Sequence, residues 1–409
     1  MNIDNSEKIE CGPDFHIRKK FVGFVSLLGS GVISAIGFML IASQRWSLFD
    51  QHLAAFIILF VQWQTLGLTI SKVGIENVVF AVVSSDRNKC FDSWQFILRK
   101  VLPLAGLYSV VVWFIFSPLA ALVSFGSILL DASSLIIMAD LNARGYYRIT
   151  SISNLLNYPI FFLILVYLHY LDKLNLNFAL GTFLFSSLLR WLWLAKTRVI
   201  PANREEVICT ASLEMGMQQV LNYLLFRNDQ LIISFFLLST LATKKIGTYV
   251  YMAKFPEIVA SVMVVAGTVY FPSMYIQYPV NWARVFSQIK KYRLYVLAYC
   301  LLMAGVVLMY RRFWSGVSFP LLVLLPFLIQ ALMVIIINNV TYSMLRQGYI
   351  SGLLRNLIVS IIAGLLYFAM VLGTGMDIYA LAWLVPIQFL IFLMLSFFSK
   401  CGKKVTLYA

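Results

Sequence analysis

Long apolar stretches separated by short polar connections make up nearly the whole chain. They are about 20 residues long, the length that an α-helix needs to cross the hydrocarbon core of a bilayer. Spans are predicted at residues 21–42, 53–71, 101–116, 119–139, 149–171, 176–195, 211–238, 246–275, 292–310, 319–342, 353–372 and 378–398. The pattern therefore predicts an all-α, polytopic integral membrane protein with about 12 transmembrane helices.

A charged connection at residues 197–207 separates the first six predicted spans from the last six. Two comparable sets of spans joined by a linker are typical of transporters. We therefore expect an N-terminal six-helix bundle with a cytoplasmic tail over residues 1–200, and a C-terminal six-helix bundle over residues 201–409. This division depends on the spacing of the spans, since no internal sequence repeat is evident.

The composition agrees with a membrane protein, because 61% of the 409 residues are hydrophobic and only 12% are charged. The net charge of +15 does not indicate nucleic acid, since the basic residues lie in connections rather than on one face of a soluble fold. Lys and Arg concentrate in both tails and in alternate connections, beginning with Arg18, Lys19 and Lys20. The positive-inside rule then places both termini in the cytoplasm.

The lengths of the predicted connections bear on enzymatic function as well as on topology. Those predicted on the external side are all short, whereas polysaccharide polymerases and membrane glycosyltransferases usually display a large external loop with catalytic groups. The long connection at residues 72–100 is internal, and four of its residues at helical spacing predict a short interfacial helix: Phe91, Trp94, Ile97 and Leu98. The five cysteines form no CxxC pair and have no histidine at metal-ligand spacing, so we expect free thiols, no metal and no cofactor.

Charges inside two neighbouring spans are the most informative feature. Arg227 and Asp229 lie in the span at 211–238, and Lys254 and Glu257 lie in the next one. If the two helices fold back antiparallel, Asp229 and Lys254 reach the same depth, each roughly 12 residues from the turn. An ionisable group within a span is costly unless it is paired or hydrated, so these residues indicate a functional site, with a purely structural ion pair as the alternative.

Successive side chains of a helix are rotated by about 100°, so these charges can be assigned to different sides of their helices. Four polar residues share one arc of the first helix: Glu214, Gln218, Asn222 and Asp229. Arg227 points nearly the opposite way, so Asp229 is not expected to neutralise it. On the second helix Lys254 and Glu257 can pair at i,i+3, and Pro256 between them is expected to kink the helix.

Other spans add polar groups. The span at 119–139 and its end carry a polar stripe: Ser124, Ser127, Asp131, Ser134 and Asn142. Arg190 lies in the span at 176–195, where snorkelling to the headgroups is the alternative to a buried role. Gln330, Asn338 and Asn339 are explained by interhelical hydrogen bonds alone. If the polar stripes of the spans at 119–139, 211–238 and 246–275 face one another, they enclose the cavity of a transporter.

The stretch RNDQLIISFFLLSTLATKKIGTYVYMAKF at residues 227–255 combines an Arg-x-Asp pair, an apolar run and a Gly-x-Tyr. It resembles the opening of the second half in the Wzx-type O-antigen and polysaccharide flippases of the multidrug/oligosaccharidyl-lipid/polysaccharide superfamily. The small-residue first span and ADLNARGYYRITSISNLL at residues 139–156 are similar to that family too. The resemblance implies a MATE-like fold and a lipid-linked oligosaccharide as substrate.

That substrate combines an anionic pyrophosphate, a polar glycan and a lipid tail, and the chain has groups for each polar part. The expected substrate-binding residues are Arg227, Lys254 and Arg190 for the pyrophosphate, and Gln218, Asn222, Ser127 and Ser134 for the glycan. The residues that could couple transport to an ion gradient by titrating are Asp131, Asp229 and Glu257.

The resulting hypothesis is a flippase, not an enzyme, in the bacterial inner membrane. It would move an undecaprenyl-pyrophosphate-linked repeat unit from the cytoplasmic to the periplasmic leaflet by alternating access, for O-antigen, lipopolysaccharide or other surface-polysaccharide biosynthesis. The alternatives are a cation-coupled drug or metabolite antiporter of the same superfamily, a polysaccharide polymerase, and a structural membrane protein. Left open are the coupling ion, a proton or sodium, and any partnership with other polysaccharide-assembly membrane proteins.

Overall fold

A computed structural model describes residues 25, 29, 33, 51–85, 89–91, 96–197, 205–207, 213–237, 249, 253, 321–346, 349–374 and 378–398. Helices make up almost all of this part of the chain. Within it, six helices are long and apolar enough to cross a membrane: Ile97–Ile115, Pro118–Ala143, Tyr147–Tyr170, Leu176–Thr197, Ile350–Gly373 and Tyr379–Ser396. The prediction of a polytopic, essentially all-α membrane protein is therefore confirmed.

The first half begins, within the described residues, with α2 (Gln51–Lys72) and α3 (Ile75–Ser85). They are separated by Val73 and Gly74, whose φ angles are 48° and 72°. A positive φ suits glycine but is costly for a β-branched residue, so Val73 holds a strained conformation at this break. The strain is retained at a place where, as described below, the second half of the molecule packs against the first.

The remaining helices of the first half follow in close succession. A π-helical turn, η1 (Ile97–Val101), runs into α5 (Leu102–Ile115), and then come α6 (Pro118–Ala143), α7 (Tyr147–Leu155), α8 (Tyr158–Tyr170) and α9 (Leu176–Thr197). Ser117 caps α6, since its Oγ accepts a hydrogen bond from the Ala120 backbone N–H at 3.1 Å. The predicted span at 149–171 is divided at Asn157, just before Pro159 at the start of α8.

The connection at 72–100 differs from its prediction. Its first part is α3, and Phe91 belongs to a strand, β1 (Lys89–Phe91), instead of an interfacial helix. Ile97 is buried in the turn that leads into α5, whereas Leu98 is exposed. The predicted interfacial helix over Phe91, Ile97 and Leu98 is therefore wrong, because the apolar spacing reflects the entry to a transmembrane helix. Trp94 lies outside the described residues.

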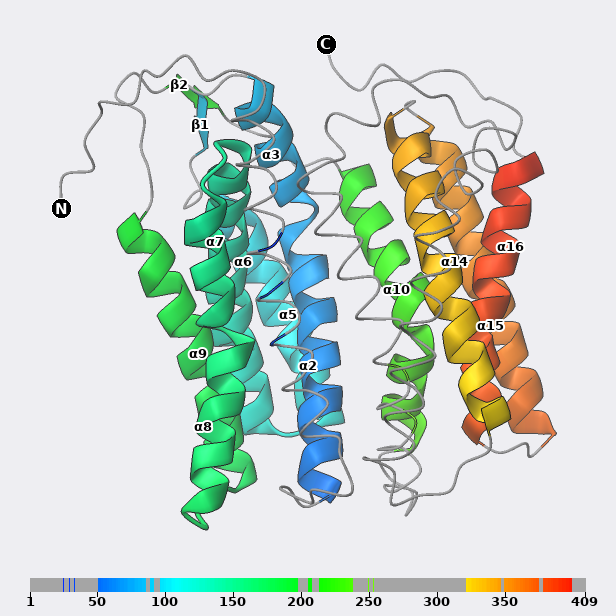
Figure 1. The fold of residues 1–409 in the computed structure, drawn as a ribbon, viewed down its shortest axis with the longest axis horizontal. Helices are drawn as coiled ribbons and strands as arrows, with labels where there is room; N and C mark the ends of the chain where they lie inside the picture. The colour runs from blue at the N-terminus through cyan, green and yellow to red at the C-terminus, as the bar shows by residue number, and fades with distance from the viewer. Residues whose placement is uncertain are drawn as a thin grey trace.

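A small parallel sheet departs from a purely helical fold. In it β1 pairs with β2 (Glu205–Val207), with Lys89 opposite Glu205 and Phe91 opposite Val207. The two strands lie with α3 at one end of the molecule (Figure 1). Since β2 comes from the predicted linker between the bundles, the sheet ties that linker to the first half.

The second half is described by α10 (Leu213–Leu237), α14 (Leu321–Arg346), α15 (Ile350–Gly373), η3 (Ile378–Trp383) and α16 (Leu384–Phe398). Helices α2 to α9 lie on one side of the molecule and α10 to α16 on the other, with α2 and α10 neighbouring each other in the middle (Figure 1). The predicted spans at 21–42, 246–275 and 292–310 lie outside the described residues, apart from five single positions. The division into two six-helix bundles at residue 200 stays a prediction.

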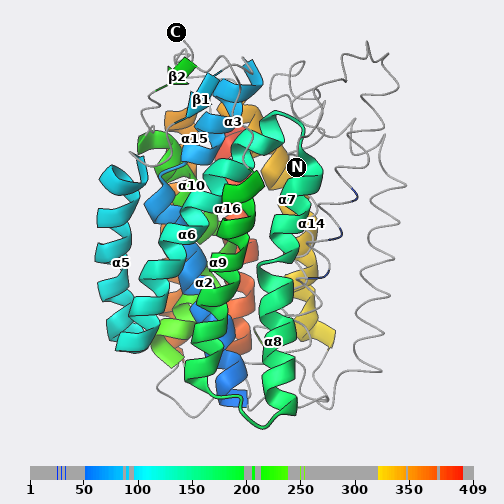
Figure 2. The same cartoon turned by 90° about the vertical axis from the view of Figure 1, so that its left-hand side faces the viewer.

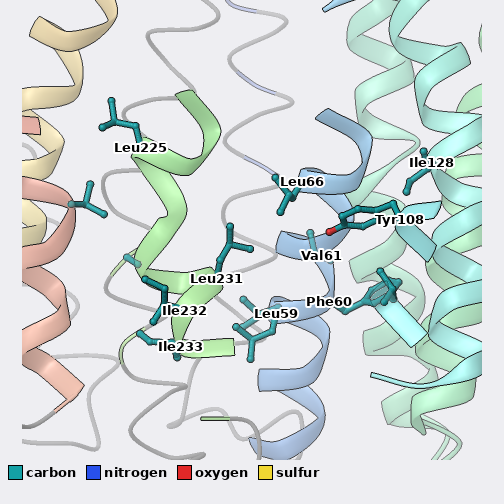
Figure 3. Close-up of a cluster of buried hydrophobic side chains, with 14 of the residues drawn as sticks. Leu59, Phe60, Val61, Leu66, Tyr108, Ile128, Leu225, Leu231, Ile232 and Ile233 are labelled. Atoms are coloured by element: carbon teal, nitrogen blue, oxygen red, sulfur yellow. The ribbon is translucent and has the colours of Figure 1, made fainter. Parts of the chain in front are cut away.

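One continuous set of buried side chains joins these helices. Leu59 and Leu66 of α2 lie on the side of that helix that faces α10, where Leu231 and Ile232 are also buried, whereas Phe60 lies on the other side (Figure 3). Large apolar side chains are exposed on the outside, as at Phe114 of α5, which lies at an edge of the molecule (Figure 2). Outer apolar surface of this kind is what a helix in contact with lipid presents.

Candidate functional site

Helix α2 connects the two halves through three consecutive residues. The Gln62 side chain faces α10, the Trp63 carbonyl accepts a hydrogen bond from the Tyr108 hydroxyl of α5 at 2.6 Å, and Gln64 faces α6. Successive residues of a helix point about 100° apart, so Gln62 and Gln64 lie on nearly opposite sides of α2. Hence α2 lies between α6 and α10 and presents an amide to each.

At the middle of the α2–α10 interface, Gln62 binds two side chains of α10. Its Oε1 accepts a hydrogen bond from Arg227 Nη1 at 2.9 Å, and the Tyr223 hydroxyl donates to the Gln62 carbonyl oxygen at 2.7 Å and to Oε1 at 3.2 Å. The guanidinium of Arg227 also lies 6.0 Å from the centre of the Tyr223 ring. Gln62 is buried, but Arg227 and Tyr223 keep part of their surface exposed. A guanidinium thus lies at the junction of the halves, in contact with a neutral amide.

A second polar contact crosses the same interface nearer to the sheet. Gln219 Nε2 of α10 donates to Glu76 Oε1 of α3 at 3.1 Å, and Glu76 also pairs with Lys72. Beside it the two backbones nearly touch, because a Cβ on Gly216 would lie 2.7 Å from Val73 Cγ1 and 3.0 Å from Val73 Cα. Only glycine fits at position 216 without displacing the strained Val73 turn.

Sequence reasoning missed most of these residues. Four residues of α10 that contact the first half repeat at helical spacing: Gly216, Gln219, Tyr223 and Arg227. The interpretation of the sequence concentrated instead on the arc of Gln218 and Asn222. The available signal was the Gln219, Tyr223, Arg227 spacing of four residues, together with Gln62 and Gln64 in an otherwise apolar stretch.

A separate ion pair is buried inside the first half, between α6 and α9. Arg190 Nη1 lies 3.5 Å from Asp131 Oδ1, and the Ser187 hydroxyl donates to Asp131 Oδ2 at 3.1 Å. The other Nη of Arg190 lies 2.9 Å from Met138 Sδ and 3.5 Å from Asn154 Oδ1. Both charged side chains are buried, so Arg190 does not snorkel to the headgroups.

The polar stripe of α6 does not face α10, contrary to the predicted cavity formed by three facing stripes. Gln64 Nε2 donates to Ser127 Oγ at 2.6 Å, and the Ser124 hydroxyl donates to Gln64 Oε1 at 2.7 Å. The Ser134 hydroxyl donates to the Leu130 carbonyl of its own helix at 2.8 Å. Since α2 lies between α6 and α10, the serines and Asp131 are buried within the first half.

The remaining predicted site residues lie in the second half. Asp229 is buried, and its Oδ2 accepts a hydrogen bond from the Tyr249 hydroxyl at 2.6 Å. Arg227 donates to Gln62 of a different helix, and the expectation that Asp229 does not simply neutralise Arg227 stays a prediction. Gln218 is buried and Asn222 is partly exposed on α10. Lys254 and Glu257 lie outside the described residues, and within those residues no group of three or more His, Cys, Asp or Glu could hold a metal ion.

Comparison with known proteins gives a distant structural likeness. No protein-family model and no curated protein matches the sequence. The crystal structure of MATE in complex with MaL6 matches with a TM-score of 0.49 and 13% identity over 92% of this chain and 94% of that chain. A crystal structure of a MATE point mutant matches with a TM-score of 0.46 and 13% identity over the same shares, and MATE in complex with Br-NRF with 0.43 and 10% identity over 93% of each chain.

At TM-scores below 0.5 these likenesses establish neither a shared fold nor a family. The class of the protein follows from its own described helices, which are long, apolar on their outer surface and closely packed. It is a multi-pass membrane protein in which polar and charged groups lie between transmembrane helices. Such groups are expensive in a bilayer and typically serve transport or helix pairing.

Proposed function

We propose that this protein transports an anionic lipid-linked substrate between membrane leaflets, as a flippase for an undecaprenyl-pyrophosphate-linked oligosaccharide. The observation that supports it best is Arg227, a partly exposed guanidinium between the two halves that donates to the neutral amide oxygen of Gln62. Guanidinium binds phosphate oxygens through two parallel hydrogen bonds, which are stronger than a bond to an uncharged oxygen. A pyrophosphate at this position would therefore compete well for Arg227.

The other proposed substrate groups lie apart from this interface. Gln218 and Asn222 belong to another side of α10 from Arg227 and remain the proposed glycan ligands. Lys254 is proposed as the second basic group for the pyrophosphate. Ser127 and Ser134 are committed to internal hydrogen bonds in this conformation, and Arg190 to Asp131, so their roles would require a rearrangement of the first half.

Transport would proceed by alternating access, with the two halves separating along the α2–α10 interface on one side of the membrane at a time. The proposed ion-coupling groups are Asp229 with Tyr249, Glu257, and Asp131 in its pair with Arg190. Either a proton or sodium could drive the cycle. We place the protein in the bacterial inner membrane with both termini in the cytoplasm, on the distribution of Lys and Arg.

A drug or metabolite antiporter is the second candidate. The observation in its favour is Asp229, a buried carboxylate bonded to the hydroxyl of Tyr249, because a buried carboxylate suits a cationic substrate or a coupling cation. The two candidates differ in the sign of the substrate charge, which makes them separable by experiment.

The deciding experiment is removal of the gene, followed by extraction of lipid-linked oligosaccharides and analysis of the surface polysaccharide. A flippase predicts complete repeat units that accumulate on their carrier at the inner leaflet, with none reaching the outer acceptor. Single units on the acceptor without chain growth would identify a polymerase. An unchanged profile would reject the flippase and leave the antiporter as the better explanation.

A further inference from the structure

Gln62 has two roles that conflict once a substrate arrives. Its side-chain oxygen accepts a hydrogen bond from Arg227 at 2.9 Å, and the same residue joins the two halves, since it belongs to α2 and Arg227 to α10. The side chain is 4% exposed, so this contact lies inside the interface rather than on the surface. An anion that binds Nη1 of Arg227 would therefore compete with Gln62 for this donor.

The contacts on the other faces of α2 determine which neighbouring helix separates from α2 when Gln62 is displaced. Tyr108 of α5 donates to the Trp63 carbonyl at 2.6 Å, and Gln64 exchanges two hydrogen bonds with Ser124 and Ser127 of α6 at 2.7 and 2.6 Å. The ring of Tyr108 also fills the space beside Gly67, where a Cβ would overlap its Cε1. These bonds keep α2 attached to the first half, so loss of the Gln62 contact loosens α2 from α10 and not from α6.

We infer that Gln62 is a displaceable ligand of Arg227, which holds the two halves together when the site is empty and is replaced by the anionic headgroup of the substrate. This inference rests on the proposed function, because it takes Arg227 as the headgroup site. A phosphate oxygen carries charge and an amide oxygen does not, so the exchange favours the substrate. Headgroup binding then removes a bond between the halves in the same step, and so couples occupancy of the site to separation of α2 and α10.

The test is equilibrium binding of radiolabelled farnesyl pyrophosphate, a short prenyl diphosphate, to the purified full-length protein in detergent. Replacing the amide oxygen by an apolar group, in Gln62→Leu, is expected to lower the Kd about fivefold, since Arg227 loses a competing acceptor worth one hydrogen bond. Gln62→Glu is expected to raise the Kd by about tenfold or more, because its carboxylate pairs with Arg227 and repels the diphosphate.

Controls separate displacement from general damage to the interface. Gln64→Leu removes a buried amide two residues away that faces α6 instead of Arg227, and it is expected to change the Kd by less than about twofold while lowering the thermal stability. Gln62→Met keeps the length of the side chain without its oxygen, and replaces Gln62→Leu if that variant fails to fold. Arg227→Gln sets the level of binding that does not depend on the guanidinium.

Opposite changes of Kd in the two Gln62 variants would support displacement, since a residue with only a packing role would alter both in the same direction. Equal or parallel changes, with wild-type binding still above that of Arg227→Gln, would overturn the role of Gln62 and leave the headgroup assignment intact. If wild-type binding does not exceed that of Arg227→Gln, the headgroup assignment and the inference both fail.

Discussion

Arg190 and Arg227 both lie within transmembrane helices, but their surroundings differ in one decisive respect. Arg190 is buried within the first half against the carboxylate of Asp131, at 3.5 Å. Arg227 lies between the halves, partly exposed, with the neutral oxygen of Gln62 at 2.9 Å. The first guanidinium has its charge balanced inside one bundle, whereas the second contacts a group that an anion can replace.

The charge of a residue within the membrane therefore does not by itself indicate function. An arginine paired with a carboxylate stabilises the packing of its bundle, because loss of either partner leaves an uncompensated charge. An arginine that donates to a neutral amide at the boundary between the two halves has a hydrogen bond that an anion can replace at low cost. The comparison leads to four predictions, in order of the expected effect.

The largest effect is expected on stability, for Arg190→Gln. Removal of the guanidinium leaves Asp131 charged and buried, which should lower the free energy of unfolding by about 3 to 5 kcal/mol. Thermal unfolding of the purified protein in detergent would measure it. The double variant Asp131→Asn/Arg190→Gln should recover part of the lost stability. Normal stability of Arg190→Gln combined with loss of transport would instead give Arg190 a role in transport and none in stability.

Arg227→Gln is expected to have the opposite effects, a small loss of stability and a large loss of transport. Loss of its hydrogen bond to the neutral amide of Gln62 should cost about 1 kcal/mol of stability, less than the loss of a buried ion pair. Transport should fall by about tenfold or more, since charge-assisted binding of the headgroup is removed. The measurement is restoration of surface polysaccharide in cells that lack the gene. Arg227→Lys, which keeps the charge but not the planar fork, should retain intermediate activity; full activity of Arg227→Gln would show that this arginine is not a substrate ligand.

A smaller effect is expected where the backbones of the two halves meet. In Gly216→Ala the new Cβ would lie 2.7 Å from Val73 Cγ1, and such overpacking should cost about 1 to 3 kcal/mol in thermal unfolding. The matched control is Gly181→Ala on α9, where a Cβ would meet nothing within 4 Å and is expected to be stabilising. Combining Gly216→Ala with Val73→Gly should recover part of the lost stability, because glycine removes the contact with Cγ1 and tolerates the φ of 48°, whereas the contact with the backbone at residue 73 remains.

The smallest effects are expected for the two serines of α6. Ser134→Ala removes only a bond to the carbonyl of Leu130 in its own helix and should change stability by less than about 0.5 kcal/mol, whereas Ser127→Ala removes an acceptor of Gln64 and should cost about 1 kcal/mol. Transport should stay normal in both, after correction for protein level. A selective loss of transport in Ser134→Ala would place this serine on the path of the glycan, as the sequence suggested.

The long helices were predictable because their apolar runs match the bilayer. The spans expected at 119–139 and 176–195 correspond to α6 (Pro118–Ala143) and α9 (Leu176–Thr197). Prediction failed at 72–100, where α3, β1 and the entry to α5 replace a loop with an interfacial helix. The apolar residues there do recur at helical spacing. Part of the stretch nevertheless forms β1, which exists only because it pairs with β2, more than a hundred residues away in the sequence. Pairing over such a separation leaves no local pattern.

The candidate site was predictable in its residue types but not in its pairing. Charge and position within the membrane identified Arg227, Asp229, Asp131 and Arg190. The partners were Gln62, Tyr223 and Tyr249. Gln62 and Tyr223 were not singled out, and Tyr249 entered only as the tyrosine of the Gly-x-Tyr motif. An uncharged amide in an apolar helix is inexpensive enough to be explained by packing alone, so Gln62 was a weaker signal than a charged residue.

The class of this protein could be predicted from its sequence. Apolar runs of bilayer length, with most Lys and Arg in the connections, allow a helical membrane protein and little else, because lipid offers no partner for an unpaired backbone group. Which polar groups contact each other depends on the tertiary structure. A helix directs successive side chains about 100° apart, and which neighbour each one reaches depends on how the helices pack. That packing gave Arg190 a carboxylate and Arg227 an amide.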